Sequence, residues 1–154
     1  MAVSTPDLSQ MTADEIAKAS AAAMWAGDNA CRHLQMKLVN VSAGRAQLSM
    51  EVQGFMTNGH GMCHGGYMFT LADSAFAYAC NSYNQNAVAQ HCSVTFLAPV
   101  KCGAVLTATA HEVSRTGRSG LYDIRVTRDN GEVVAEFRGH SRTIKGTWLP
   151  QQGQ

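Results

Sequence analysis

Charge is scarce in this sequence. Acidic and basic residues make up only 15% of its 154 residues, whereas about a quarter is usual. Between Glu51 and Lys101 only one such residue occurs, Asp73. A surface so poor in charge favours contact with another subunit, so we expect an oligomer. The formal net charge of +1 argues against a chain that binds nucleic acid or an anionic membrane through general charge.

Signatures of membranes and disulfides are also missing. No apolar run approaches the roughly 20 residues of a membrane-spanning helix, and the first residues carry acids where a signal peptide carries bases. The five cysteines are odd in number and form no CxxC pair, which argues against a disulfide scaffold. We therefore expect reduced thiols and a cytoplasmic protein.

The length and the absence of internal boundaries predict one folded domain. A chain of 154 residues can bury a substantial core, and no repeat, low-complexity tract or linker divides it. We expect an N-terminal extension with a helix over 1–27, the folded domain over 28–146 and a C-terminal tail over 147–154.

The N-terminal part predicts a helix followed by two strands. Thr12 and Glu15 have the spacing of a capping box before an alanine-rich stretch, so a helix should begin there and end near Gly27. Apolar residues then alternate with polar ones over 45–52, which is typical of a half-buried strand. We expect its partner over 35–41.

The rest of the chain predicts a buried helix and four more strands. An almost wholly apolar segment from about Gly65 to Asn81 predicts a helix buried on all sides. The four strands, expected in a meander, are at 90–98, 104–114, 120–128 and 132–144. Because little else in so short a chain could bury the helix, an antiparallel sheet of about five to six strands should wrap around it, giving an α+β fold.

Asp73 lies in that apolar helix, where an ionised carboxylate costs several kcal/mol unless it is paired or hydrogen-bonded. It could cap a backbone break, meet a distant arginine or lie on an exposed face. It could also be a desolvated acid that acts as base or nucleophile. The segment His64–Gly66 at the expected helix start favours the second interpretation, since glycine amides at the positive end of a helix dipole can hold an oxyanion. The same glycines also suit simple close packing.

The spacing of these groups adds a constraint. Gly65 and Asp73 are eight residues apart, which is about 12 Å along a helix. One carbonyl group cannot easily touch both. If both serve one substrate, they should come from different subunits whose helices run antiparallel across a two-fold axis. This predicts two equivalent sites at a dimer interface.

At these residues the sequence resembles the hotdog-fold thioesterases, most closely the PaaI-type enzymes of phenylacetate degradation. The resemblance runs from about Asp28 to Gly146. Its most specific segments are NGH at 58–60, CHGG at 63–66, LADSAFAYACNS at 71–82, FLAP at 96–99 and FRG at 137–139. It implies the hotdog fold, in which an antiparallel sheet wraps a long central helix, and dimers that join into a homotetramer.

The resemblance also implies an activity. The expected reaction is hydrolysis of (hydroxy)phenylacetyl-coenzyme A or a similar aryl thioester to the free acid and coenzyme A, without a metal or redox cofactor. Asp73 then corresponds to the general base or nucleophile, and Gly65 to the amide that polarises the thioester carbonyl from across the interface. Asn58 and His64 resemble the positions that orient the thioester and the helix start. A broad-range medium-chain acyl-coenzyme A thioesterase and a non-catalytic acyl-coenzyme A binding module remain alternatives.

Coenzyme A carries phosphates, and from Lys101 onward the sequence holds eight Lys/Arg against five Asp/Glu. The resemblance places the loop at 115–119 near the nucleotide, where guanidinium groups suit phosphate oxygens. The residues expected to contact the substrate or coenzyme A are Gly66, Phe96, Arg115, Thr116, Gly117, Arg118, Ser119 and Arg142. For the arginines, ordinary solvated charges of a hairpin are the alternative.

Two further points concern polar residues. Several relatives carry serine or threonine on the strand after the helix, where this sequence reads Ala-Gln-His at 89–91, so the residue that takes this role stays open.

A possible metal cluster consists of His60, Cys63, His64 and Cys80. Its spacing matches none of the common zinc sites. Cys63 as a nucleophile lacks an identifiable orienting group.

Overall fold

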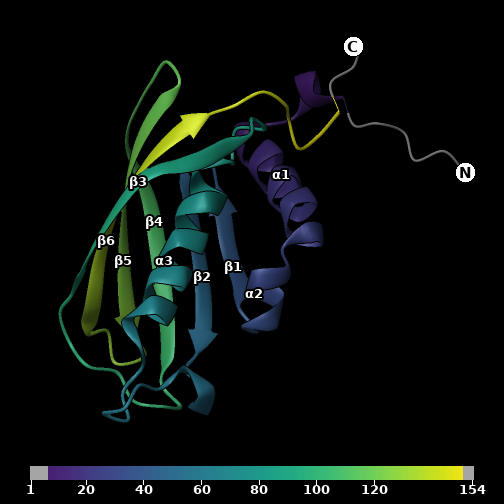
Figure 1. The fold of residues 1–154 in the computed structure, drawn as a ribbon. Helices are drawn as coiled ribbons and strands as arrows, with labels where there is room; N and C mark the ends of the chain where they lie inside the picture. Colours follow the sequence, from purple (N-terminus) through teal and green to yellow (C-terminus); the bar gives the residue numbers. More distant parts are fainter. Residues whose placement is uncertain (1–6, 151–154) are drawn as a thin grey trace, which may run out of the picture.

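The computed structural model describes residues 7–150. Its α-helices are α1 (Ala13–Gly27), α2 (Asn29–His33) and α3 (Gly65–Cys80), and short 3-10 helices lie at Leu8–Gln10 and Gly54–Met56. Its strands are β1 (Lys37–Ser42), β2 (Arg45–Glu51), β3 (Ala87–Phe96), β4 (Val105–Thr116), β5 (Ser119–Arg128) and β6 (Val133–Thr143). The strands form one antiparallel sheet that curves around α3 (Figure 1), which confirms the predicted α+β architecture. Within the described residues, no helix is both long and apolar enough to cross a membrane.

The order of the strands corrects one prediction. The order is β1-β2-β4-β5-β6-β3, so β4, β5 and β6 form a meander but β3 does not lie beside β4. β4 pairs with β2, from Val105 opposite Glu51 to His111 opposite Arg45, while β3 pairs with β6 at the far edge. The predicted four-strand meander is therefore wrong. The reason is that the chain crosses the sheet in α3 before β3 begins, and the alternation of side chains within a strand does not identify its neighbours.

α1 begins where the sequence predicts. Thr12 Oγ1 accepts a hydrogen bond from the Glu15 N–H at 3.2 Å, and a Glu15 carboxylate oxygen accepts one from the Thr12 N–H at 2.7 Å. This capping box satisfies two amides that would otherwise lack partners. After Gly27 the chain enters α2 at once, because Asp28 Oδ1 accepts from the Cys31 N–H at 3.0 Å. α2 is missing from the sequence-based expectation, since aspartate and asparagine after glycine also mark turns.

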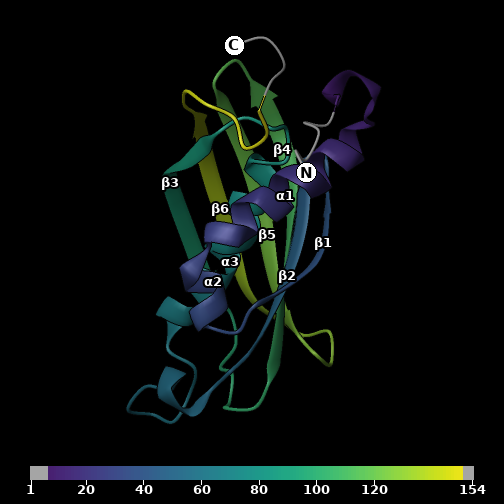
Figure 2. The ribbon, with the colours of Figure 1, turned by 90° about the vertical axis from the view of Figure 1, so that its right-hand side faces the viewer.

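α3 lies against the concave face of the sheet, with α1 on its other side (Figure 2). Its buried residues are Met68, Leu71, Ala72, Ala75, Phe76, Tyr78, Ala79 and Cys80. The Phe76 ring centroid lies 5.5 Å from that of Tyr122 and 6.1 Å from that of Phe137. A Cβ atom at Gly139 would come within 2.8 Å of the Phe76 ring, so glycine is required there. Burial of each such aromatic side chain contributes about 1.5–3 kcal/mol, which holds α3 and therefore Asp73 in place.

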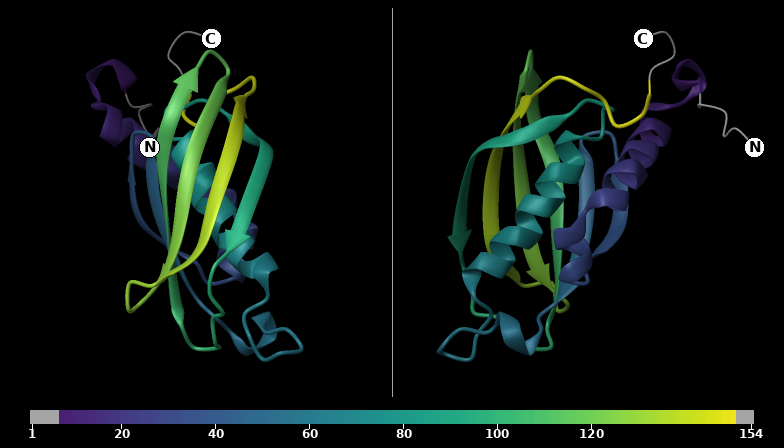
Figure 3. Two further views of the ribbon diagram at one scale, coloured as in Figure 1. Left: turned by 90° about the vertical axis from the view of Figure 1, so that its left-hand side faces the viewer. Right: turned by 45° about the vertical axis from the view of Figure 1, so that its right-hand side comes forward.

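The two edges of the sheet differ (Figure 3). At one edge α1 packs against β1. At the other, no strand within residues 7–150 pairs with the outer edge of β3. Val88 and Phe96 of β3 are large apolar side chains that are about half exposed. An uncovered edge strand of this kind is a template for pairing with another chain.

A β-bulge interrupts β3. Ala89 lies opposite Ser141 and His91 lies opposite His140, so Gln90 is left without a partner residue. The extra residue reverses the alternation of the strand. As a result Cys92, which lies opposite Gly139, faces α3. The segment at 89–91, whose role is open at the level of sequence, is this bulge.

Candidate active site

Asp73 lies in the middle of α3 on the side that faces β3, and it is partly buried. The Cys92 thiol donates a hydrogen bond to Asp73 Oδ1 at a sulfur–oxygen distance of 3.9 Å. Within residues 7–150, no backbone amide, lysine or arginine contacts the carboxylate. A backbone cap and an arginine partner, two of the structural explanations for Asp73, therefore find no support in the described residues.

The surroundings of Asp73 change its acidity. Burial raises the pKa of the Asp73 carboxyl above its ordinary value, and the hydrogen bond from Cys92 opposes this shift. The pKa of the Cys92 thiol is also raised, to about 11, first by burial and then by the negative charge of Asp73. Cys92 is therefore a protonated donor at neutral pH, and Asp73 is a stronger base than a solvated carboxylate. Sequence reasoning missed Cys92, because the bulge that turns it inward leaves no simple signal.

Within residues 7–150, one amide at the start of α3 has no acceptor. His64 is the N-cap residue, and its Nδ1 accepts a hydrogen bond from the Gly66 N–H at 2.9 Å. This bond requires a lone pair on Nδ1, which places the ring proton on Nε2. The Gly65 N–H has no acceptor among the described residues. Of the two glycine amides at the helix start, Gly66 is thus used by the protein itself, whereas Gly65 is available to a ligand.

Phe96 explains in packing terms why residue 65 is glycine. A Cβ atom at Gly65 would come within 2.7 Å of the Phe96 ring. The ring belongs to the last residue of β3 and is 49% exposed. The structure therefore brings Phe96, expected from the sequence to line the coenzyme A site, close to Gly65.

Asn58 shapes the loop before α3. Its Oδ1 accepts hydrogen bonds from the His60 N–H at 2.9 Å and the Met62 N–H at 3.3 Å, and its own N–H donates to the Met62 carbonyl at 2.7 Å. The side-chain nitrogen of Asn58 has no acceptor within the part of the chain that the structure describes. Asn58 thus holds the loop with its oxygen and leaves two amide protons unused.

The distance argument holds in the folded chain. α3 is a continuous helix across Gly65 and Asp73, so the two positions are separated by about 12 Å along its axis. One protomer cannot place its own Gly65 amide and its own Asp73 carboxylate on the same carbonyl group.

The predicted coenzyme A loop is the turn between β4 and β5, where Gly117 has a φ of +58°. The Arg115 guanidinium lies 3.5 Å from the centroid of the Tyr83 ring and 3.8 Å from Glu112. Arg118 donates from Nε and Nη2 to the Thr143 carbonyl at 3.2 and 3.1 Å. Both arginines are therefore held by the protein itself, although both remain exposed.

The remaining predicted contacts gather around the same turn. Thr116 lies opposite Ser119 in the hairpin, and Ser119 lies opposite Arg142 of β6. Arg142 is exposed. The turn is at the end of the sheet where α3 finishes, whereas Gly65 is at the other end (Figure 1). The structure thus brings the arginines together but separates them from Gly65 of the same chain.

A pocket of about 380 Å³ opens beside Asp73. Its lining residues are Met24, Asp73, Phe76, Ala77, Cys80, Asn81, Asn86, Ala87, Val88, Ala89, Ile144 and Trp148. Most of these side chains are apolar, and two are aromatic. Trp148 is a second functional candidate that the sequence did not single out, because nothing in the tail at 147–154 marks it as part of the core.

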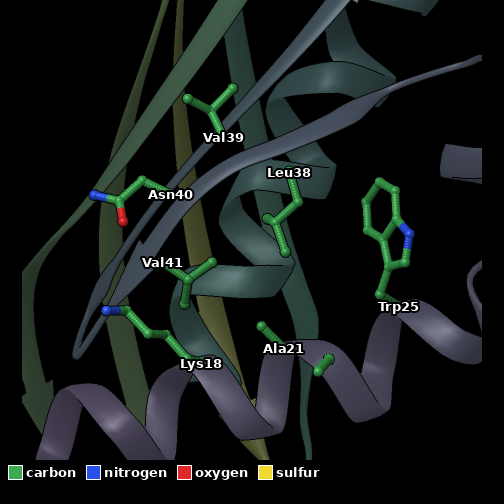
Figure 4. Close-up of a pocket in the computed structure, with 8 residues that line it drawn as sticks. Lys18, Ala21, Trp25, Leu38, Val39, Asn40 and Val41 are labelled. Carbon is green, nitrogen blue, oxygen red and sulfur yellow. The ribbon is translucent and has the colours of Figure 1, made fainter.

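A larger groove lies between α1 and β1, with a volume of about 550 Å³. Figure 4 shows that Leu38 and Val41 of β1 point towards α1, where Ala21 and Trp25 lie. Lys18 is the sole titratable residue in its lining. The groove contains no carboxylate, histidine or thiol, so the amine of Lys18 is the one side chain in its lining that could act as a base or nucleophile. Separately, no group of three or more His, Cys, Asp or Glu side chains within residues 7–150 is placed to hold a metal ion.

Comparisons with known proteins agree with the resemblance. The model of the thioesterase superfamily matches residues 60–135. The acyl-coenzyme A thioesterase PaaI of Escherichia coli K12 is 43% identical over 128 residues, which cover 83% of this chain and 91% of that protein. The solved structure of E. coli PaaI, from the phenylacetic acid degradation operon, superposes with a TM-score of 0.87 at 41% identity and covers 88% of this chain and 99% of that one. A mutant of the phenylacetic acid degradation protein PaaI of Thermus thermophilus gives a TM-score of 0.73 at 34% identity, over 76% of this chain and 100% of that one.

The sheet wrapped around a central helix is the hotdog fold of the thioesterase superfamily. Within it, the chain belongs to the PaaI-type acyl-coenzyme A thioesterases and is a thioester hydrolase. The family and the fold that the sequence predicts are both confirmed.

Proposed function

We propose that the protein hydrolyses (hydroxy)phenylacetyl-coenzyme A or a closely similar aryl thioester to the free acid and coenzyme A. The observation that carries this proposal is Asp73: a partly buried carboxylate with a raised pKa, contacted by a single thiol and bordered by an apolar pocket. The names of the E. coli and T. thermophilus relatives, which refer to phenylacetic acid degradation, favour an aryl acid.

The proposed site is shared between two copies of the chain. Asp73 of one protomer faces the thioester carbonyl, and the N–H of the partner's Gly65 binds the carbonyl oxygen as negative charge develops on it. The free Gly65 amide and the separation of about 12 Å from Asp73 along one helix support this arrangement. The edge of β3, which no described strand covers, is the surface we propose for the dimer. We further propose that two dimers associate into a tetramer.

The proposed dimer also gives a position for coenzyme A. The arginines of the β4–β5 turn lie at the end of the sheet away from Gly65 of their own chain (Figure 1). If two α3 helices run antiparallel across the interface, that end lies near the partner's Gly65. Arg118 and Arg142 can then contact phosphate oxygens of a nucleotide whose thioester lies between Asp73 and that amide. Arg115 can bind a phosphate either from its present position or after its guanidinium has moved away from Tyr83 or Glu112.

Two chemical routes fit the geometry. In the first, an Asp73 oxygen attacks the carbonyl carbon, the carbon–sulfur bond breaks, and coenzyme A leaves as a thiolate that takes up a proton; water then hydrolyses the mixed anhydride. In the second, Asp73 removes a proton from water, which attacks the carbonyl directly and expels coenzyme A. One turnover in water labelled with heavy oxygen tests the first route, because label enters the Asp73 side chain only when water attacks the Asp73 carbonyl of a mixed anhydride.

Substrate identity is tested with a panel of phenylacetyl, hydroxyphenylacetyl, benzoyl and straight-chain thioesters. A higher kcat/KM for the phenylacetyl compounds supports the proposal, whereas uniform rates across medium straight chains support the broad-range alternative. The non-catalytic alternative predicts binding without turnover. The absence of a cofactor, a cytoplasmic location and the domain limits at 28 and 146 stay predictions.

A further inference from the structure

The C-terminal segment of the chain contributes to the wall of the pocket beside Asp73. Ile144 and Trp148 line it together with Phe76 of α3 and Val88 of β3. Ile144 follows β6 directly, and Trp148 lies four residues further on. The predicted tail at 147–154 therefore contributes, in its described part, to the wall of the candidate active site.

Hydrogen bonds hold this segment against the loop that follows α3. The Ile144 N–H donates to the Asn86 carbonyl at 2.8 Å, and the Asn86 N–H donates to the Gly146 carbonyl at 3.0 Å. Further along, the Leu149 N–H donates to Asn84 Oδ1 at 2.8 Å. Gly146 has a φ of +101°, a conformation that favours glycine. These bonds lie on both sides of Trp148, so its backbone is fixed.

The indole ring of Trp148 is fixed as well. Its Nε1–H donates to Asn81 Oδ1 at 2.9 Å. Asn81 is 3% exposed and follows the last residue of α3. Its Oδ1 also accepts from the Ala87 N–H at 2.9 Å, and its Nδ2 donates to the carbonyls of Ala77 and Ala87 at 2.9 and 3.0 Å. A buried amide with both ends occupied has one orientation, and it gives the ring of Trp148 one orientation too.

The contents of the pocket follow from its walls. The carbonyl carbon of a bound thioester must lie within about 3–3.5 Å of the attacking oxygen. This carbon carries the acyl group on one side and the sulfur of coenzyme A on the other, so one of these two groups extends from Asp73 into the pocket. The thiol side, pantetheine, is rich in amides, whereas the pocket is mostly apolar and has the two aromatic rings of Phe76 and Trp148. Its volume of about 380 Å³ exceeds the about 150 Å³ of an apolar protein cavity that binds benzene.

We propose that this pocket binds the acyl group of the substrate and that Trp148 forms its closed end, so that Trp148 limits the length of the acyl chain and favours a flat aryl ring. The inference rests on the proposed thioesterase function and adds a specificity-determining residue to it. Trp148 acts through shape and ring contact, while Asn81 positions it.

The two tryptophans of the chain provide a direct test, because Trp25 lies in the groove between α1 and β1 (Figure 4) and Trp148 in the pocket. In Trp25→Phe the sole tryptophan is Trp148, and in Trp148→Phe it is Trp25. The ligand is phenacyl-coenzyme A, a thioether that keeps an aryl ring and a carbonyl group but has no thioester bond. We expect a saturable change of tryptophan fluorescence in Trp25→Phe and none in Trp148→Phe.

Coenzyme A alone is the matched ligand control. If it changes the fluorescence of Trp148 as much as phenacyl-coenzyme A does, the pocket takes the thiol side and the inference is wrong. If phenacyl-coenzyme A binds, as measured by calorimetry, without altering Trp148 fluorescence, the inference is also wrong. Both binding outcomes can be measured even if the wild-type protein hydrolyses no thioester. Absence of hydrolysis would overturn the proposed function by itself.

Substrate preference gives a second readout. Trp148→Ala opens the closed end, so the ratio of kcat/KM for octanoyl-coenzyme A over phenylacetyl-coenzyme A should rise by at least about tenfold, since one methylene in a fitted pocket is already worth about 10–200-fold. Trp25→Ala, in the other groove, should leave this ratio unchanged. A ratio that stays constant in a folded Trp148→Ala protein, or that changes equally in both variants, would overturn the inference. If Trp148→Ala does not fold, the fluorescence experiment decides.

Discussion

The two ends of α3 are built for different tasks. At the N-terminal end, His64 binds the Gly66 amide and leaves the Gly65 amide without an acceptor among the described residues. At the C-terminal end, Asn81 donates to two carbonyl groups and accepts from the Ala87 N–H and from Trp148. One end presents a free donor, whereas at the other end the Asn81 side chain makes hydrogen bonds with both its oxygen and its nitrogen.

The difference teaches how one helix can serve both stability and chemistry. An unsatisfied amide at a helix start, together with the positive end of the helix dipole, is suited to a developing negative charge. A buried amide side chain with every hydrogen bond made is suited to fixing the packing around it. Asp73 lies between these two regions, so changes at the start of α3 should alter catalysis and changes at its end should alter stability.

The largest effect is expected for Asp73→Asn. Removal of the carboxylate should lower kcat by at least about a hundredfold, the low end for a positioned base, measured by release of free coenzyme A. The matched control is Asp129→Asn, which changes an exposed aspartate in the β5–β6 turn and should retain full activity. Equal activity in both variants would remove Asp73 from the mechanism.

The same variant tests the cost of burying the charge. Burial raises the pKa of Asp73 above its unfolded value, so its contribution to stability is fully present below the unfolded pKa and is lost as pH rises through the folded pKa. At neutral pH, Asp73→Asn should therefore be at least as stable as the wild type in thermal unfolding. A lower Tm would show that the carboxylate stabilises the fold, contrary to this interpretation.

A smaller loss of activity is expected for Gly65→Val. The new side chain collides with the Phe96 ring, which is half exposed and can move aside, so the fold should survive while the free amide becomes blocked. We expect kcat/KM to fall by about tenfold to a hundredfold, somewhat less than the about 10²–10³ for complete loss of an oxyanion donor. Gly27→Val adds a side chain at a helix end with open space around its Cβ position and should retain activity.

Asn81→Ala should act mainly on stability. It removes the partner of the Ala87 amide and of Trp148, and a buried donor left without an acceptor costs about 1–3 kcal/mol. Urea unfolding should show this loss, while kcat for phenylacetyl-coenzyme A should change less than in Gly65→Val. A large loss of kcat with unchanged unfolding would contradict the division between the two ends of α3.

The smallest effect is expected at Cys92. Its thiol hydrogen bond lowers the pKa of Asp73 against the effect of burial. In Cys92→Ala this opposition is lost, so the acid limb of the profile of kcat/KM against pH should move to higher pH. In Cys92→Ser a hydroxyl donor remains, and the limb should stay in place or move to lower pH. A shift in the same direction in both variants would mean that Cys92 acts only through packing.

Particular residues show what the sequence could and could not predict. The capping box at Thr12, the buried helix and most strand limits follow from local spacing, which acts within a few residues. The position of β3 beside β6 depends on how the chain crosses the sheet, and the bulge at Gln90 depends on the pairing of two strands. Neither the position of β3 nor the bulge can be predicted from the sequence of a single segment.

The candidate site divides in the same way. Asp73 and Gly65 stand out because a lone charge and a glycine pair contrast with their neighbours in sequence. Cys92 and Trp148 do not, since their importance comes from contacts across 19 and 67 residues of chain. The sequence predicts Arg115 at the nucleotide, but its packing on Tyr83 and its ion pair with Glu112 are visible only in the folded chain.

Mixing of subunits tests most directly whether one chain supplies Asp73 and the other the Gly65 amide. Asp73→Asn homodimers should keep about a hundredth of the activity or less and Gly65→Val homodimers about a tenth or less, but a mixed dimer contains one site with an intact Asp73 and an intact partner's Gly65. Unfolding and refolding an equal mixture should therefore restore about a quarter of the wild-type turnover. If the refolded mixture is no more active than the two variants measured separately, while mass spectrometry shows that mixed dimers have formed, the shared site does not exist.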